Sequence, residues 1–380
     1  MISKVIYYGA SLVLNRILLL VPLKKNKVLF LSDVRDDLTG NFQFINNSLP
    51  QSYIKVTSLK ADRREKHTFI DWLKQSYHIA TSGFILLDDY CEATAFIKVR
   101  KNQELIQLWH SSGAFKKFAH SRNGQGGDIQ RIHPGYVKYT KAITSSAGIN
   151  KCFSDAFKIP YERVFPTGIP RTDIFFDDEY KEKVKEDFFG KYPELKNKKL
   201  VLFAPTYRGT KVSDADYDFE MLDLKMLRDR LGSEYVILVK WHPALYNNIN
   251  YGISKGVNLS GFEGFVYDFS QFREINDLLF VIDILVTDYS SLIFDYCLLG
   301  KPIIHYIFDL EEYDGGRGLY FDFSEYIYGK VAKTKEDLVD AIINSGNNIE
   351  LTGKFVNKFI AKNDGNATNR VIREFFIKGS

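Results

Sequence analysis

Residues 283–296 constrain the fold most, because they predict a buried strand that runs directly into the start of a helix. A short apolar run over 284–287 is followed by Asp288, Ser290 and Ser291, and then by a second apolar run. Asp and Ser are the residue types that cap helix N-termini. Free backbone N–H groups and hydroxyls would therefore converge at one point, which predicts a phosphate site.

Two further apolar runs, over 201–204 and 236–239, also end in polar or cationic residues. Such strand ends are typical of the carboxyl edge of an open parallel sheet, where ligands bind. The residues that we expect to meet there are Arg208, Lys240, His242, Thr287, Asp288, Ser290 and Ser291. Taken singly, each motif has an ordinary structural explanation as a helix cap or a turn, and Asp288 either caps the helix or orients His242. Their joint placement favours a binding site.

The composition excludes several classes of protein. A net charge of +4 over 380 residues is too small to indicate nucleic acid as a partner. Cys91, Cys152 and Cys297 are too few and too far apart for a disulfide framework, which suits a reducing cytoplasm. No metal motif, P-loop or dinucleotide fingerprint is present. We therefore expect no protein-bound metal and no tightly bound cofactor, while dependence on a divalent cation stays open.

The N-terminal segment 1–25 is strongly apolar, although Lys4, Asn15 and Arg16 interrupt it. Three interpretations are open, namely a helix on the membrane surface, a core helix and a membrane-spanning helix. The charges favour the surface helix. The residues expected to enter the lipid are Leu12, Val13, Ile17, Leu20 and Val21, and those expected to contact anionic head groups are Lys24, Lys25 and Lys27.

Alternating strand and helix patterns predict two α/β domains, over 26–175 and 176–350. The last segment, 351–380, contains a helix that could pack back on the first domain. Strands are expected near 27–32, 53–57, 78–81, 84–88, 105–110, 138–145 and 163–168, and then near 200–204, 235–239, 283–286 and 302–306. Helices are expected over 63–75, 93–99, 147–157, 179–189 and 366–377. Two doubly wound Rossmann-like domains facing a cleft form the GT-B architecture.

Five short motifs occur in one order, at 108–117, 167–173, 204–208, 240–243 and 286–291. Together they resemble the CDP-glycerol glycerophosphotransferase family, which builds wall teichoic acids and some capsules. The likeness extends over about 101–322. The segment after Trp109-His110 reads Ser-Ser-Gly-Ala-Phe-Lys-Lys, not the commoner Gly-Thr-Pro-Leu-Lys. This variant looks more like the primase branch, although polymerase activity stays open.

The resemblance implies transfer of glycerol phosphate, or another polyol phosphate, from CDP-glycerol to a hydroxyl of an undecaprenyl-diphosphate-linked acceptor, with release of CMP. It implies that His110 is the general base. Arg208, His242, Thr287, Ser290 and Ser291 match positions that hold the donor diphosphate. On chemical grounds, His242 either neutralises the leaving CMP as a protonated donor or closes a turn before Pro243. Lys116 and Lys117 either grip the lipid diphosphate of the acceptor or form a solvated pair.

Other functions remain as alternatives. A CDP-ribitol donor or a capsule polymerase belongs to the same family, whereas a UDP-sugar glycosyltransferase or epimerase shares only the architecture. A non-catalytic membrane scaffold is the third class. The leading hypothesis places a peripheral enzyme at the cytoplasmic face of the cell membrane, and the sequence leaves a homo-oligomer open.

Overall fold

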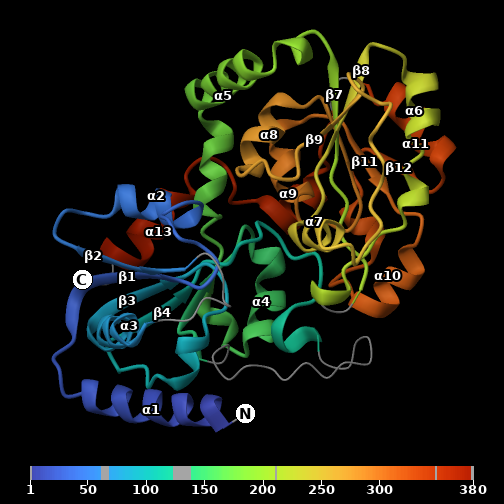
Figure 1. The fold of residues 1–380 in the computed structure, drawn as a ribbon. Helices are drawn as coiled ribbons and strands as arrows, with labels where there is room; N and C mark the ends of the chain where they lie inside the picture. The colour runs from blue at the N-terminus through green and yellow to red at the C-terminus, as the bar shows by residue number, and fades with distance from the viewer. Residues whose placement is uncertain (1, 61–67, 123–137, 210–211, 347–348, 378–380) are drawn as a thin grey trace.

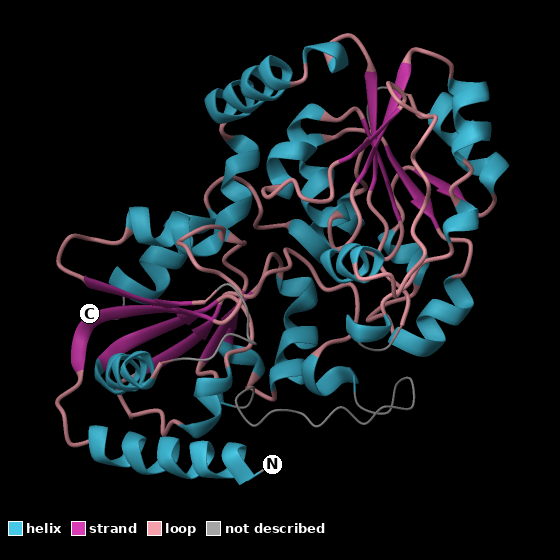
Figure 2. Ribbon diagram, in the orientation of Figure 1, coloured by secondary structure: helices cyan, strands magenta, loops and turns pink. Residues whose placement is uncertain are grey.

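The computed structural model describes residues 2–60, 68–122, 138–209, 212–346 and 349–377. The chain forms two parallel six-stranded sheets, each with helices packed on both sides (Figures 1 and 2). The two sheets belong to separate halves of the molecule (Figure 1). This is the predicted α/β, GT-B-like arrangement.

The first sheet has the strand order β2-β1-β3-β4-β5-β6. Its strands are β1 (Lys24–Ser32), β2 (Ile54–Leu59), β3 (Ser82–Leu87), β4 (Glu104–Gln107), β5 (Lys141–Ile143) and β6 (Val164–Phe165). The order in which strands are added reverses between β1 and β3, because β2 lies on one side of β1 and the later strands lie on the other, and this creates a crevice position at their carboxyl ends. Residues 28–32 of β1 are buried, as expected for a strand covered on both faces.

The second sheet has the strand order β12-β11-β10-β7-β8-β9. Its strands are β7 (Lys199–Phe203), β8 (Tyr235–Val239), β9 (Val266–Asp268), β10 (Ile284–Thr287), β11 (Ile303–Tyr306) and β12 (Lys330–Ala332). Here the reversal falls between β7 and β10, which lie side by side at the centre. All residues of β8 and β10 are buried, so their apolar runs form core strands.

The helices fill the connections and the two ends of the chain. They are α1 (Ile2–Leu18), α2 (Asn41–Ser48), α3 (Phe69–Thr81), α4 (Asn150–Phe157), α5 (Asp178–Lys191), α6 (Leu224–Leu231), α7 (Pro243–Asn250), α8 (Ile275–Val281), α9 (Ile293–Tyr296), α10 (Leu310–Arg317), α11 (Lys335–Ile343), α12 (Gly353–Phe355) and α13 (Ala367–Ile372). A π-helical turn, Arg373–Ile377, continues α13. These last residues lie against the first sheet, where Phe376 contacts Tyr53 and Phe84.

The expected strand at 78–81 is wrong, because these residues form the last turn of α3. Lys27 of β1 lies beside that turn and donates to the Thr81 hydroxyl at 2.7 Å. The sequence analysis also missed β9 and β12, which are three residues long and lie at the two edges of the second sheet. The expected helix at 63–75 begins partly outside the described residues, and its described part belongs to α3.

Helix α1 lies along the outside of the first domain, next to α3 (Figure 1). Two of its polar side chains face the protein: Ser11 accepts a hydrogen bond from Trp72 at 3.1 Å, and Asn15 accepts one from the Lys98 N–H at 3.0 Å, whereas Arg16 is exposed. Its apolar side chains face outward, with Val13 61% and Ile17 57% exposed. Within the described part of the chain, no helix is both long and apolar enough to cross a membrane, so the membrane-spanning alternative is not supported.

Candidate active site

The carboxyl ends of β7 and β10 form the centre of the candidate site in the second domain. Asp288, directly after β10, is buried and accepts hydrogen bonds from the Thr206 N–H at 2.8 Å and its hydroxyl at 2.9 Å. Thr287 donates to the Ala204 carbonyl at 2.7 Å. These bonds tie the two strand ends together at the reversal point of the sheet, where a ligand is expected to bind.

Arg208 occupies a tight frame of carboxylates and aromatic rings. Its guanidinium donates to Asp288 at 2.8 Å and to both oxygens of Asp309 at 2.5 and 2.9 Å. A further bond of 2.7 Å reaches the Thr206 carbonyl. The rings of Tyr289 and Tyr313 lie within 5.2 Å of its central carbon. Burial lowers the pKa of Arg208, but the two carboxylates outweigh this effect and the net shift is upward.

The structure therefore gives Arg208, Asp288 and Thr287 partners within the protein. Asp288 does not cap α9, whose N-cap is Leu292 without a side-chain hydrogen bond. A clamp of this kind holds the loops around the site in place, because breaking it would leave buried carboxylates without a counter-charge. The predicted contacts of these three residues with a diphosphate stay predictions.

Lys240 follows β8, as predicted, but it turns toward the neighbouring loop. Its ammonium donates to the carbonyls of Phe269, Ser270 and Phe272 at 3.3, 3.3 and 2.6 Å. These bonds use the three donors of a lysine ammonium. Burial lowers the pKa of Lys240 to about 8. In this structure Lys240 fixes the loop after β9, and its expected contact with a substrate stays a prediction.

A cationic cluster, defined as Lys116, His242 and Arg317, lies at the same sheet edge. Burial, and then the nearby Arg317, lower the pKa of Lys116 to about 8, while Asp288 opposes the shift. The Arg317 guanidinium lies 5.9 Å from the centre of the Tyr207 ring, and that ring is 4.8 Å from the His242 ring. Like charges held together in a partly buried place favour an anionic ligand.

His242 is the N-cap of α7, and its Nδ1 accepts the Ala244 N–H at 3.2 Å. Its Nε2 therefore carries the proton of the neutral ring. Burial, followed by Lys116 and Arg317, lowers the pKa of His242 to about 4. Burial and the two neighbouring cations therefore favour the neutral ring in the ligand-free protein, and a protonated His242 beside a bound donor stays a prediction. His242 can still donate from Nε2.

Ser290 and Ser291 lie in the turn between β10 and α9, and both are half-buried. The Ser290 hydroxyl oxygen accepts the Leu292 N–H at 3.2 Å, so it orders the turn as a capping residue does. Helix α9 is only four residues long, and a 3-10 turn, Cys297–Leu299, continues it. The predicted strand–turn–helix segment is present, and its helix is short.

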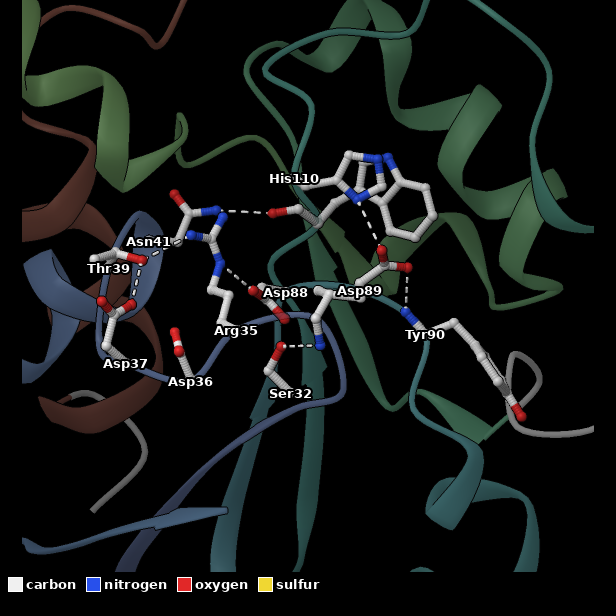
Figure 3. A network of polar contacts seen from close by, with 12 residues as sticks. Ser32, Arg35, Asp36, Asp37, Thr39, Asn41, Asp88, Asp89, Tyr90 and His110 are labelled. Atoms are coloured by element: carbon white, nitrogen blue, oxygen red, sulfur yellow. Dashed lines mark hydrogen bonds and ion pairs between the residues drawn. The ribbon is translucent and has the colours of Figure 1, made fainter. Parts of the chain in front are cut away.

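His110 follows β4 at the carboxyl edge of the first sheet. Its side chain is 49% exposed, and its Nδ1 lies 3.6 Å from a carboxylate oxygen of Asp89 (Figure 3). The preceding residue, Trp109, has a φ of 57° and stacks on His110 with ring centres 4.4 Å apart. Asn41 holds the Trp109 carbonyl with a 2.8 Å bond. An unusual backbone and two neighbours thus set the direction of an otherwise open imidazole.

The segment from His110 to Lys117 links the two halves of the site. Ser112 donates to Asp295 at 2.6 Å, and Asp295 also binds Arg171 at 2.8 Å. A side chain on Gly113 would meet the Phe294 ring at 2.4 Å, so only glycine fits there. The Lys117 N–H donates to the Gly318 carbonyl at 2.9 Å, which places Lys116 and Lys117 beside the end of α10. The segment therefore begins in the first domain and ends in the second.

Sequence reasoning missed Arg317, Tyr207 and Asp89. Arg317 ends α10, where cations are common, so the sequence offers a helix terminus as its simplest explanation. Tyr207 stands between two residues of a motif that was noticed, and Asp89 follows a strand that was predicted. The rule that polar residues after parallel strands meet at one edge could have identified Asp89. Among the described residues, no group of three or more His, Cys, Asp or Glu could hold a metal ion.

Two α/β domains with parallel sheets define a GT-B-like protein, and a cationic cluster lies at the edge of the second sheet. The family model described as CDP-Glycerol:Poly(glycerophosphate) glycerophosphotransferase matches residues 13–377, so the chain belongs to this family.

Several proteins are similar to this chain. The teichoic acid poly(ribitol-phosphate) polymerase of Bacillus spizizenii is 41% identical over 93% of this chain, which spans only 56% of that polymerase. The teichoic acid ribitol-phosphate primase of the same organism is 33% identical over 95% of this chain and 94% of its own length. A variant of the wall teichoic acid polymerase TagF, soaked with CDPG, has the same fold, with a TM-score of 0.75 at 19% identity, over 100% of this chain and 97% of that chain.

Proposed function

We propose that the protein transfers a polyol phosphate from a CDP-polyol to a hydroxyl of an undecaprenyl-diphosphate-linked acceptor, with release of CMP, in the synthesis of wall teichoic acid. The observation that carries this proposal is the cationic cluster of Lys116, His242 and Arg317. One segment of chain connects this cluster to His110 on the other domain. Membership of the family supports the same reaction class.

In this proposal the cationic cluster holds the donor diphosphate. Lys116 and Arg317 neutralise the phosphate oxygens, and His242 donates from Nε2 to the oxygen that leaves with CMP. Ser290 and Ser291 add hydroxyls and N–H groups from the turn before α9. Arg208 acts indirectly, because its bonds to Asp288 and Asp309 keep the surrounding loops in place.

His110 is the general base in this proposal. The acceptor oxygen attacks the phosphorus that bears the polyol, the bond from phosphorus to the CMP oxygen breaks, and the hydroxyl proton passes to His110. Asp89, with a carboxylate oxygen 3.6 Å from the His110 Nδ1, is placed to hold the ring in position. A histidine suits this task because its ordinary pKa lies near neutral pH.

For the polyol, ribitol is favoured over glycerol. The two Bacillus spizizenii proteins that are 41% and 33% identical to this chain are named for ribitol phosphate, whereas two others of that organism, at 28% and 30% identity, are named for glycerol phosphate, and the TagF structure carries CDPG. The site offers no independent choice between them. Glycerol phosphate therefore remains the alternative polyol, and a UDP-sugar transferase is the alternative of another class.

The proposed place of action is the cytoplasmic face of the membrane, with α1 on the lipid surface. Leu12, Val13, Ile17 and Leu20 are 48%, 61%, 57% and 85% exposed, while two polar residues of α1 face the protein. Lys24 and Lys25 are exposed next to them. Lys27 is not available for lipid, because it is buried against His78 and Thr81. An outward apolar face with flanking lysines is typical of interfacial helices.

One reaction tests the chemistry. The protein is incubated with CDP-ribitol, CDP-glycerol or UDP-N-acetylglucosamine and a lipid-linked disaccharide acceptor, and CMP release and product mass are measured. We expect CMP and a product heavier by one or more polyol phosphates. Turnover of the UDP-sugar without any CMP from either CDP-polyol would overturn the proposal.

Flotation with anionic vesicles tests the membrane surface. Leu12→Gln with Ile17→Gln should reduce vesicle binding without unfolding the protein, because both side chains point to solvent. The matched control is Val212→Gln with Ile253→Gln, which are 62% and 63% exposed in the second domain. Equal loss in both pairs would contradict a specific role for α1.

A further inference from the structure

The residue before His110 is held in an unfavourable backbone conformation. Trp109 has a φ of 57°, in the left-handed region that a bulky side chain rarely adopts. Two buried side chains hold it there: its N–H donates to the Gln107 Oε1 at 2.9 Å, and its carbonyl accepts from the Asn41 Nδ2 at 2.8 Å. Figure 3 shows the bond from Asn41 to the backbone next to His110. Strain of this kind persists only where the surroundings enforce it, so the buried neighbours set the direction in which the chain presents His110.

The residues after His110 are held from the second domain. The Ser112 hydroxyl donates to the Asp295 Oδ1 at 2.6 Å, and these two residues are 1% and 4% exposed. A Cβ atom on Gly113 would collide with the ring of Phe294, the residue before Asp295, so the two segments are in direct contact. Asp295 therefore reaches the segment of the proposed base from the domain that is proposed to bind the donor.

Arg171 joins these two sets of contacts. Its backbone N–H donates to the Asn41 Oδ1 at 3.0 Å, while its guanidinium donates to the second oxygen of Asp295 at 2.8 Å. Asn41 thus uses its oxygen toward Arg171 and its amide nitrogen toward Trp109, so a flipped amide would break both bonds. A buried network in which donors and acceptors are matched specifies one geometry, here on both sides of His110.

Asp295 also belongs to the segment that is proposed to hold the donor. It lies in α9, directly after the turn that contains Ser290. The Ile293 N–H donates to the Ser290 carbonyl at 3.3 Å, so backbone hydrogen bonds join the turn to the helix. The bond from Asp295 to Ser112 therefore fixes the separation between the donor turn and the segment that carries His110.

We infer that Asp295 is a positioning residue for the transfer reaction: through Ser112 and Arg171 it sets where the segment with His110 stands relative to the donor turn. The inference rests on the proposed function for the roles of His110 and Ser290. Asp295 contacts neither substrate and acts through geometry alone. Transfer between two bound substrates is sensitive to such geometry, because a displacement of about 1 Å can lower the rate by about 10²-fold.

Ser112→Ala is the mildest test, because Asp295 keeps its ion pair with Arg171. We expect kcat to fall roughly 10- to 100-fold. The KM for the CDP-polyol and the Kd for CDP should stay within about twofold, because no contact with the donor is removed. Asp295→Asn keeps the size of the side chain but removes its charge, and it should lower kcat at least as far. Because both changes act on one network, the double variant should lose much less than the product of the two single losses.

Ser145→Ala is the matched control. Ser145 is also a buried serine of the first domain, and its hydroxyl bonds a distant part of the chain, the Phe359 carbonyl. The control should lower the melting temperature about as much as Ser112→Ala does and leave kcat within about twofold. Equal losses of kcat in the two serine variants would show a general structural effect and overturn the inference.

A measurement without turnover separates this inference from the proposed function. The imidazole NMR signals of His110 in the full chain, assigned by their absence in His110→Ala, report the surroundings of the ring. We expect Ser112→Ala to shift these signals and Ser145→Ala to leave them in place. Such a shift, with no transfer by the native protein, would support the positioning network and contradict the proposed function. Native transfer, with unchanged His110 signals and unchanged kcat in both Ser112→Ala and Asp295→Asn, would overturn the inference alone.

Discussion

The carboxyl edges of the two sheets differ in how completely the protein satisfies its own polar groups. At the second edge, Asp288 is 1% exposed and Arg208 has carboxylates on two sides. At the first edge, His110 is 49% exposed and lies 3.6 Å from Asp89, outside hydrogen-bonding distance. The polar groups at the carboxyl edge of the second sheet are paired without a ligand, whereas His110, at the carboxyl edge of the first sheet, stays exposed to solvent.

This difference suits a protein that binds two substrates of unlike chemistry. A diphosphate is compact and highly charged, so a rigid cationic site can be formed in advance with little ordering on binding. An acceptor hydroxyl carries no charge, and the base that deprotonates it must be reached from solvent. The comparison predicts that changes at the first edge alter the reaction, while changes at the second alter stability and donor binding.

The largest effect is expected from His110→Ala. Removing a general base lowers the transfer rate by about 10²- to 10⁴-fold. Binding of the CDP-polyol, measured by calorimetry, should change only a few-fold, because His110 belongs to the other domain. His120→Ala is the control, because it removes another imidazole of the first domain, from the 3-10 turn Ala119–Arg122. Loss of donor binding in His110→Ala would place this residue in the donor site. It would contradict the division of roles between the carboxyl edges of the two sheets.

The second largest effect is expected from Arg208→Ala, and it should appear in stability. The change leaves Asp288 and Asp309 beside each other without their shared cation. Breaking a buried ion pair in this way costs about 3–5 kcal/mol of folding free energy. Chemical denaturation measures the loss. Arg208→Lys should recover only part of it, because an ammonium cannot make the bidentate bonds of a guanidinium. A fully stable Arg208→Ala would show that the second edge is not held by this clamp.

The central strands of both domains could be predicted because they are apolar and buried. Residues 235–239 and 284–287 read as strands in the sequence and are strands in the structure. The edge strands β9 and β12 have three residues each and carry exposed positions, so no apolar run marks them. Residues 78–81 resemble a strand locally, but the helical turns before them and the cap at Ser82 keep them in α3.

The contacts within the candidate site are harder to predict, because a sequence does not show which charges neutralise one another. Arg208 and Lys240 looked like phosphate ligands, yet their donors bind Asp309 and the loop carbonyls. After burial, Arg317 is the next largest cause of the lowered pKa of Lys116. The two residues are far apart in the chain and come close only in the fold. Burial, and after it the same two residues, lower the pKa of His242.

A smaller effect, on donor affinity, is expected from Lys116→Met and Arg317→Gln. Each change removes a charge-assisted bond to the diphosphate worth about 1.5–3 kcal/mol. Calorimetry with CDP should therefore show affinity reduced by roughly 10- to 150-fold. Lys225→Met is the control, because Lys225 is an exposed residue of α6. Unchanged CDP affinity in both cluster variants would move the donor away from the second edge.

The smallest effect is a proton taken up when CDP binds at alkaline pH. In the free protein the pKa of Lys116 is about 8, so a large fraction of its amines is neutral at pH 8 to 9. A diphosphate placed beside it favours the charged form and raises that pKa. The complex then binds more protons than the free protein, so CDP affinity should fall as the pH rises above about 8.

Calorimetry at pH 8.5 in buffers of different ionisation enthalpy measures the uptake, and this window avoids the titration of the CDP phosphate near pH 6. We expect up to one proton for the native protein and close to none for Lys116→Met. The same uptake in both proteins would mean that another group titrates, and that the second edge is less completely formed before binding than the structure indicates.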